Sequence, residues 1–304
     1  MSQANALPDL PSPALRPFAH VGRMVLDVVH YLGGMGLLGV SAFRSIIRPR
    51  GEVPSLAPAV ARHLDRIFRF GLPLVAIVHV GLGSFMAMQA YFGATFMDGI
   101  GPVVGVGMVR NVGPLISAMV LGGLVAALFT TELRGHDRDA LDRDPSWLPD
   151  REVLAHHDTD PRGAVEPARL AASRMIATVI AGPILGVWGA LVGIAVGYFV
   201  AAGMLNTRGP AFWDMFFQML WARDVSGVIL KGLMFGLAIS WFACYEGLRH
   251  GDGPVPDPID TPFVAVRAAC LGGCAILLGN SAWFLLFYHA GPAFGPTLLA
   301  PPMS

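Results

Sequence analysis

Apolar segments of about 20 or more residues recur along this chain, and they constrain its fold more than any other feature. They cover residues 70–92, 112–131, 175–205, 225–248 and 264–288. A helix needs about 20 apolar residues to cross a hydrocarbon core about 30 Å thick. Only 14% of the 304 residues are charged, whereas about a quarter are charged in soluble domains. The sequence therefore predicts an all-α integral membrane protein with about five transmembrane helices.

A further apolar segment, residues 24–43, precedes these five and is less uniform. It contains Asp27 and His30 and is flanked by Arg23 and Arg44. Such a segment fits an interfacial helix whose polar groups face lipid headgroups, and a membrane span is the alternative. The predicted parts of the chain are an N-terminal tail (1–23), an interfacial helix with a basic cytoplasmic segment (24–69), a five-span domain (70–288) and a C-terminal tail (289–304).

Basic residues are distributed unevenly among the connections. Arginines gather in residues 44–69 and in the long loop 133–174, two more are Arg249 and Arg267, and none follows Arg267. Because cytoplasmic loops are enriched in Lys and Arg, these regions are predicted to face the cytoplasm and the C-terminus the opposite side. Prolines interrupt residues 133–168, which leaves at most short helices there. We expect this loop to dock a soluble partner.

Short polar and glycine-containing motifs stand in a fixed order on the apolar segments. They are Met88-Gln89-Ala90-Tyr91, then Arg110-Asn111-Val112-Gly113-Pro114, then Thr130-Thr131-Glu132-Leu133, then Arg174, Ala177 and Pro183, and finally Asp224, Lys231, Phe235-Gly236 and Cys244-Tyr245-Glu246-Gly247. This order resembles that of the MlaE/YrbE permeases, which serve the MCE lipid-transport systems. The resemblance covers about residues 64–288. It implies a divergent member with the MlaE-type permease fold, in which the N-terminal helix lies along the membrane.

The resemblance implies a permease subunit of an ATP-driven lipid transport system in the bacterial inner membrane. Its partners would be an ABC ATPase subunit, an MCE-domain protein, a second permease copy or paralogue, and a membrane lipid such as a phospholipid. No nucleotide-binding G-x(4)-G-K-[ST] motif occurs, so no cofactor is expected on this chain and ATP would bind the partner subunit. A formal net charge of zero gives no reason to expect a nucleic acid partner.

Four residues are candidates for lipid binding: Tyr91 and Arg110, which match the lining of the family's cavity at its dimer interface, with Gln89 and Asn111 beside them. Arg110 either binds a lipid phosphate through paired hydrogen bonds or extends to the headgroups, as arginines at helix ends do. Gln89 has a structural alternative too, a hydrogen bond between helices.

Four other residues are candidates for coupling to the ATPase: Glu132, Asp139, Leu141 and Glu246. Glu132 ends a helix, where the macrodipole disfavours a negative charge, so we expect it to pair with an arginine of loop 133–168 or of the ATPase. Glu246 lies close to the end of its segment, and solvation there is slightly favoured over a coupling role.

Asp224 and Lys231 are intramembrane polar candidates, two helical turns apart on one face. An ionisable residue inside the apolar region is costly and therefore functional by default. The structural alternative is a buried ion pair between Lys231 and an acid of another span. His156-His157-Asp158 lacks further ligands at metal-binding spacing, so we predict a solvated loop and no metal site.

Some positions depart from the family pattern. Asn111 replaces the glutamate of R-E-L-G-P, Leu124 stands where an arginine is usual, and only Asp139-Ala140-Leu141 remains of the family's coupling helix. These departures suggest the divergent partner of a heterodimer, or a permease for a lipid other than a common phospholipid. The alternative to an active permease is a degenerate scaffold subunit of an MCE complex. A membrane enzyme acting on lipid through Asp224, Lys231 or Glu246 is a third class, although no catalytic motif supports it.

Overall fold

The computed structural model describes residues 16–47, 56–93, 100–143, 167–204, 209–249 and 260–289. These residues are almost entirely helical and include no strand. The α-helices are α1 (Arg16–Ile47), α2 (Ala57–Gly93), α3 (Ile100–Gly107), α4 (Gly113–Arg143), α5 (Pro167–Met204), α6 (Gly209–Met219), α7 (Ala222–Leu248) and α8 (Asp260–Phe284). A π-helical turn, Met108–Val112, joins α3 to α4, and a second one, Leu285–His289, follows α8.

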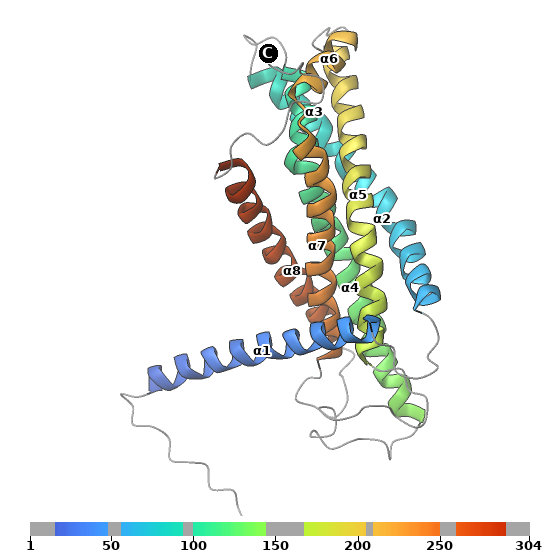
Figure 1. Ribbon diagram of the computed structural model, residues 1–304, viewed down its shortest axis with the longest axis vertical. Coiled ribbons are helices and arrows are strands. Elements are labelled where there is room, and N and C mark those ends of the chain that lie inside the picture. The colour runs from blue at the N-terminus through green and yellow to red at the C-terminus, as the bar shows by residue number, and fades with distance from the viewer. Residues whose placement is uncertain are drawn as a thin grey trace, which may run out of the picture.

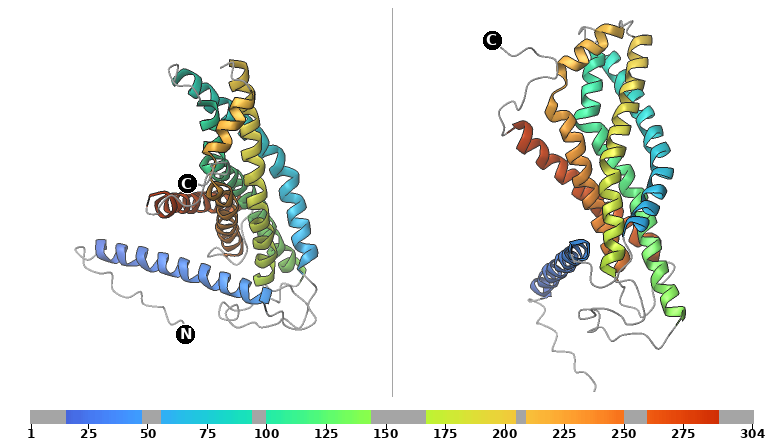
Figure 2. Two further views of the ribbon diagram at one scale, coloured as in Figure 1. Left: turned by 45° about the horizontal axis from the view of Figure 1, so that its top comes forward. Right: turned by 45° about the vertical axis from the view of Figure 1, so that its right-hand side comes forward.

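Five long helices, α2, α4, α5, α7 and α8, form an elongated bundle, and α1 runs across one end of it (Figures 1 and 2). All six are long and apolar enough to cross a membrane. Because α1 lies across the bundle, it cannot span the same bilayer as the other five. The arrangement confirms an all-α membrane protein with a five-helix bundle preceded by a helix that lies differently.

The loop predicted for residues 133–174 is wrong at both ends. Helix α4 continues to Arg143, and α5 already begins at Pro167. No proline occurs between Pro114 and Pro145, so nothing in the backbone ends α4 at the point where its side chains become polar. Proline is favoured in the first turn of a helix, where its missing N–H is not needed, which suits Pro167. The motif His156-His157-Asp158 lies outside the described residues.

The ends of other helices also differ from the predicted ones. Helix α2 begins at Ala57 rather than at residue 70, so part of the predicted basic segment belongs to a membrane helix. The short helices α3 and α6 were not expected and pack against each other. In α3, Pro102 and three glycines interrupt the apolar pattern, which hides a helix of only eight residues from a search for long spans.

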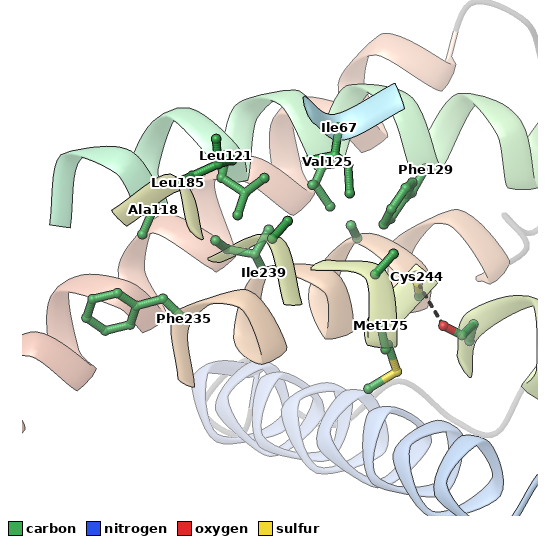
Figure 3. Packing of buried hydrophobic residues seen from close by; sticks show 14 of the residues in the cluster. Ile67, Ala118, Leu121, Val125, Phe129, Met175, Leu185, Phe235, Ile239 and Cys244 are labelled. Carbon is green, nitrogen blue, oxygen red and sulfur yellow. Dashed lines mark hydrogen bonds between the residues drawn. The ribbon is translucent and has the colours of Figure 1, made fainter. Parts of the chain in front are cut away.

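Buried side chains of α2, α4, α5 and α7 form the main core (Figure 3). Within it, α5 and α7 approach so closely that backbone meets backbone. A Cβ atom on Gly232 would lie 2.5 Å from the Pro183 nitrogen, and one on Gly236 would lie 2.6 Å from the Thr178 carbonyl oxygen. Small residues allow this approach between membrane helices, and it holds α7 in a defined register against α5.

Candidate functional site

One polar cluster, Arg110, Asp224 and Lys231, lies where the π-helical turn before α4 meets the beginning of α7. Asp224 lies in the first turn of α7, where its carboxylate accepts a hydrogen bond of 3.1 Å from the Trp221 backbone N–H. A negative charge is favourable at a helix N-terminus. The Asp224 side chain is fully buried, so it needs a positive partner.

Arg110 supplies that partner. Its Nε and Nη2 atoms donate to the two Asp224 oxygens at 3.0 and 2.9 Å, a paired geometry that favours arginine over lysine. About a third of the Arg110 side chain stays exposed. Arg110 is therefore anchored by an ion pair between helices and does not simply extend toward headgroups.

Lys231 completes the cluster by a different contact. It is fully buried, and its Nζ atom donates to the Arg110 carbonyl oxygen at 3.0 Å. In a regular helix that carbonyl would receive its hydrogen bond from residue 114, which here is a proline without an N–H. Nζ also lies 4.7 Å from the centre of the Phe284 ring. Asp224 thus binds the side chain of Arg110, and Lys231 binds its backbone.

The structural alternative for Lys231, an ion pair with an acid of another span, stays a prediction. The Asp224 carboxylate, on the same helix as Lys231, interacts electrostatically with the Lys231 ammonium. The Lys231 ammonium is therefore balanced by the Asp224 charge together with the Arg110 carbonyl oxygen and the Phe284 ring. Asn111, the next residue along the chain from Arg110, has an Oδ1 atom that is buried without a hydrogen-bond partner among the described residues.

The other lipid-binding candidates are less clearly placed. Gln89 lies exposed near the end of α2, and no hydrogen bond of its side chain supports the structural alternative. Tyr91 lies two residues further along α2, outside the residues whose side chains the structure describes.

A second polar cluster surrounds Glu132 near the other end of α4. Glu132 accepts a hydrogen bond of 3.0 Å from Arg174 of α5 and forms a salt bridge with Arg66 of α2. His63 Nδ1 lies 3.9 Å from the same carboxylate. Both of these arginines belong to helices α2 and α5, whereas the sequence pointed to an arginine of loop 133–168 or of an ATPase. In the sequence Arg174 stands out only as part of a motif, and nothing there distinguishes Arg66 as a partner of Glu132.

A third carboxylate, Glu246, lies near the end of α7 and is fully buried. Arg267 of α8 pairs with it, with Nε 2.8 Å from Oε2, and the Tyr31 hydroxyl of α1 donates to Oε1 at 2.7 Å. The prediction that Glu246 is solvated is therefore wrong. The helices α1 and α8 cover this end of α7, and the sequence alone does not show that they do.

Helix α1 reaches α7 through glycines. The Trp241 indole N–H donates to the Met35 carbonyl at 2.8 Å. Beside it, a Cβ on Gly34 would lie 2.5 Å from the Tyr245 hydroxyl, and one on Gly39 would lie 2.8 Å from Cε2 of Trp241. These contacts fix one end of α1 against the bundle. The other coupling candidates, Asp139 and Leu141, lie in the last turns of α4, and their side chains are outside the described part.

Comparison with known proteins gives one family and several relatives. The sequence profile of a family described as Permease MlaE matches residues 163–262. A probable ABC transporter permease protein of Rickettsia prowazekii is 29% identical over 278 residues, which are 90% of this chain and 99% of the relative. A probable ABC transporter permease protein of Rickettsia conorii is 28% identical over 88% of this chain and 96% of its own length.

One relative has a more specific description. The intermembrane phospholipid transport system permease protein MlaE of Haemophilus influenzae is 23% identical over 234 residues. The match covers 75% of this chain and 82% of the Haemophilus protein. All three relatives therefore match most of this chain.

Proposed function

We propose that this chain is a divergent member of the MlaE permease family and that it is the membrane subunit through which an ATP-driven system moves phospholipids between membranes. As an ABC transporter permease it is a multi-pass membrane protein rather than an enzyme. In the proposed assembly, two permease chains lie in the bacterial inner membrane. A cytoplasmic ATPase binds at one end, and an MCE-domain lipid carrier binds at the other.

The observation that carries this proposal is the convergence of Arg110, Asp224 and Lys231. Two motifs that are more than a hundred residues apart meet here inside a bundle of membrane helices. Ionisable groups at such a depth are costly and mark substrate pathways. The partly exposed guanidinium of Arg110 is oriented by Asp224, and a guanidinium suits a lipid phosphate. In this proposal Arg110 binds the headgroup, and Gln89, Tyr91 and Asn111 line the lipid path nearby.

The opposite end of the bundle supports the coupling part of the proposal. Glu132 connects α4 to α2 and α5, and Glu246 connects α7 to α8 and α1. A force applied by an ATPase to the end of α4, where Asp139 and Leu141 lie, would pass through Glu132 to two further helices. A force on α1 would pass through Glu246 in the same way.

The test is to purify the tagged chain from its native membrane and to identify the proteins and lipids that accompany it. The proposal predicts an ABC ATPase, an MCE-domain protein and bound phospholipid. In nanodiscs, lipid should stimulate ATP hydrolysis by the complex. Arg110→Lys keeps the charge but not the paired hydrogen bonds, so the stimulation should fall while the complex stays assembled.

A non-transporting scaffold makes a different prediction. Its favouring observation is Asn111, which stands in place of the glutamate of R-E-L-G-P and whose Oδ1 atom is buried without a hydrogen-bond partner among the described residues. A complex that contains the MCE protein and the ATPase but shows neither bound lipid nor lipid-stimulated ATP hydrolysis would establish the scaffold and refute transport.

A further inference from the structure

A basic groove lies on the outer surface of α2, at the end of the bundle where Glu132 lies. It is lined by Ala61, Arg62, Asp65, Arg66, Arg69 and Phe70. The three arginines are spaced by four and three residues, so they lie on one face of the helix. We call the surface lined by these residues the α2 arginine groove. It is about 30 Å along α4 from Arg110, well separated from the lipid path proposed above.

The groove carries more positive than negative charge. Arg62 and Arg69 are exposed, and neither forms a salt bridge with any carboxylate of the described residues. Arg66 contacts Glu132, yet nearly half of its side chain remains exposed, 47%. Asp65 is the single carboxylate in the lining. The groove therefore suits an anion, and arginine forks match a phosphate well.

The same face of α2 changes abruptly from basic to apolar. With 3.6 residues per turn, positions 62, 66, 69, 73, 77 and 80 fall within an arc of about 80°. The later three are Pro73, Ile77 and Val80, and Ile77 and Val80 are exposed by 70% and 45%. Since α2 is a candidate membrane span, the exposed apolar stripe is suited to acyl chains, and the arginines beside it are suited to headgroups.

We propose that Arg62, Arg66 and Arg69 bind the phosphate headgroup of an anionic phospholipid of the cytoplasmic leaflet, whose acyl chains lie along Ile77 and Val80. A phospholipid joins an anion to apolar chains in the same order as this face of α2. An acidic surface of a soluble protein would satisfy the arginines but not the adjoining apolar stripe. Clustered basic side chains at the cytoplasmic ends of membrane helices attract anionic lipids.

This site has a structural consequence for the Glu132 cluster. Arg66 belongs both to the groove and to the salt bridge with Glu132. A lipid bound there therefore contacts Arg66, and Arg66 in turn contacts the Glu132 carboxylate that connects α2, α4 and α5. Anionic lipid should accordingly stabilise the packing of α2, whereas a zwitterionic lipid should not.

The test compares retention of phosphatidylglycerol and phosphatidylcholine by the full chain, using native mass spectrometry after extraction from mixed nanodiscs. Wild type should retain phosphatidylglycerol preferentially, and added salt should weaken the preference. Arg62→Gln/Arg69→Gln should lower it about tenfold or more, whereas Arg62→Lys/Arg69→Lys should keep most of it. Arg23→Gln/Arg44→Gln removes the same charge from α1 and serves as the matched control, with unchanged retention.

A second measurement does not depend on the variants. A photoreactive phosphatidylglycerol should crosslink to wild-type peptides that contain residues 62–80, and crosslinks only elsewhere would refute the site. Equal retention of the two lipids by wild type, or unchanged retention in the Gln variant, would also refute it. The site would also be refuted if the Gln variant lost only its dimerisation or its binding of the ATPase. The groove would then bind a second copy or a soluble partner.

Discussion

Replacing Gly232 by alanine should force α5 and α7 apart. The new Cβ would lie 2.5 Å from the Pro183 nitrogen, and the obstructing atoms belong to the backbone, which cannot rotate away. Ordinary contacts of a Cβ atom lie at 3.4–4 Å. The two helices must therefore separate by about 1 Å at this point, which is large compared with the tolerance of a close-packed interior.

The cost follows from that separation. Overpacking a well-packed core typically costs about 1–3 kcal/mol. Here the value should lie at the upper end, because the same movement also weakens the contacts of Gly182 and Gly236 along the helix pair. Alanine favours a helix over glycine by only about 0.5–1 kcal/mol, so this gain offsets a minor part. We expect a net destabilisation of about 2 kcal/mol.

The assay is thermal unfolding of purified protein in nanodiscs, followed by loss of the monodisperse peak in size-exclusion chromatography. Gly123→Ala is the matched control: it makes the same change inside α4, where no heavy atom lies within 4 Å of the new Cβ. That control should be as stable as wild type or slightly more stable. If Gly232→Ala proves as stable as Gly123→Ala, the backbone contact between α5 and α7 is not the constraint described above.

The polar contacts give three further predictions. Arg110→Gln removes the guanidinium that pairs with the buried Asp224 carboxylate and should cost about 3–5 kcal/mol of stability. Adding Asp224→Asn should recover part of this loss, and a purely additive loss in the double variant would contradict the pairing. Glu246→Gln keeps the shape of the side chain but removes its charge, and should lower stability by about 1–2 kcal/mol in the same thermal assay, since its arginine partner is half exposed. Gly39→Leu should detach α1 from Trp241. We expect faster proteolysis within α1, while the stability of the bundle stays unchanged. An unchanged rate of proteolysis would show that this contact does not hold α1.

Much of the membrane architecture can be predicted from the sequence, because the physical constraint is one-dimensional. A span must be apolar over the thickness of the bilayer, and this is a property of consecutive residues. The five segments and the distinct N-terminal segment therefore correspond to helices in the structure. Their ends are harder to predict: α4 continues to Arg143 after its side chains become polar, because a helix needs no apolar residues outside the membrane.

The polar contacts required the tertiary structure. The sequence identified Arg110, Glu132, Asp224 and Lys231 as polar residues at or within membrane helices, since each is conspicuous among apolar neighbours. It did not identify their partners, because pairing depends on which faces of distant helices meet. Glu132 and Arg174 are 42 residues apart and belong to different helices.

Glu246 shows the same limit most clearly. Its place near the end of an apolar segment indicates a solvated carboxylate, and in a separate helix it would be one. In the structure α1 and α8 cover it, and Tyr31 and Arg267 supply the hydrogen bonds that a buried carboxylate needs. The sequence by itself determined which segments enter the membrane, because that depends on the composition of each segment. Only the tertiary structure decided which charges are buried and paired, because burial depends on neighbours that are remote along the chain.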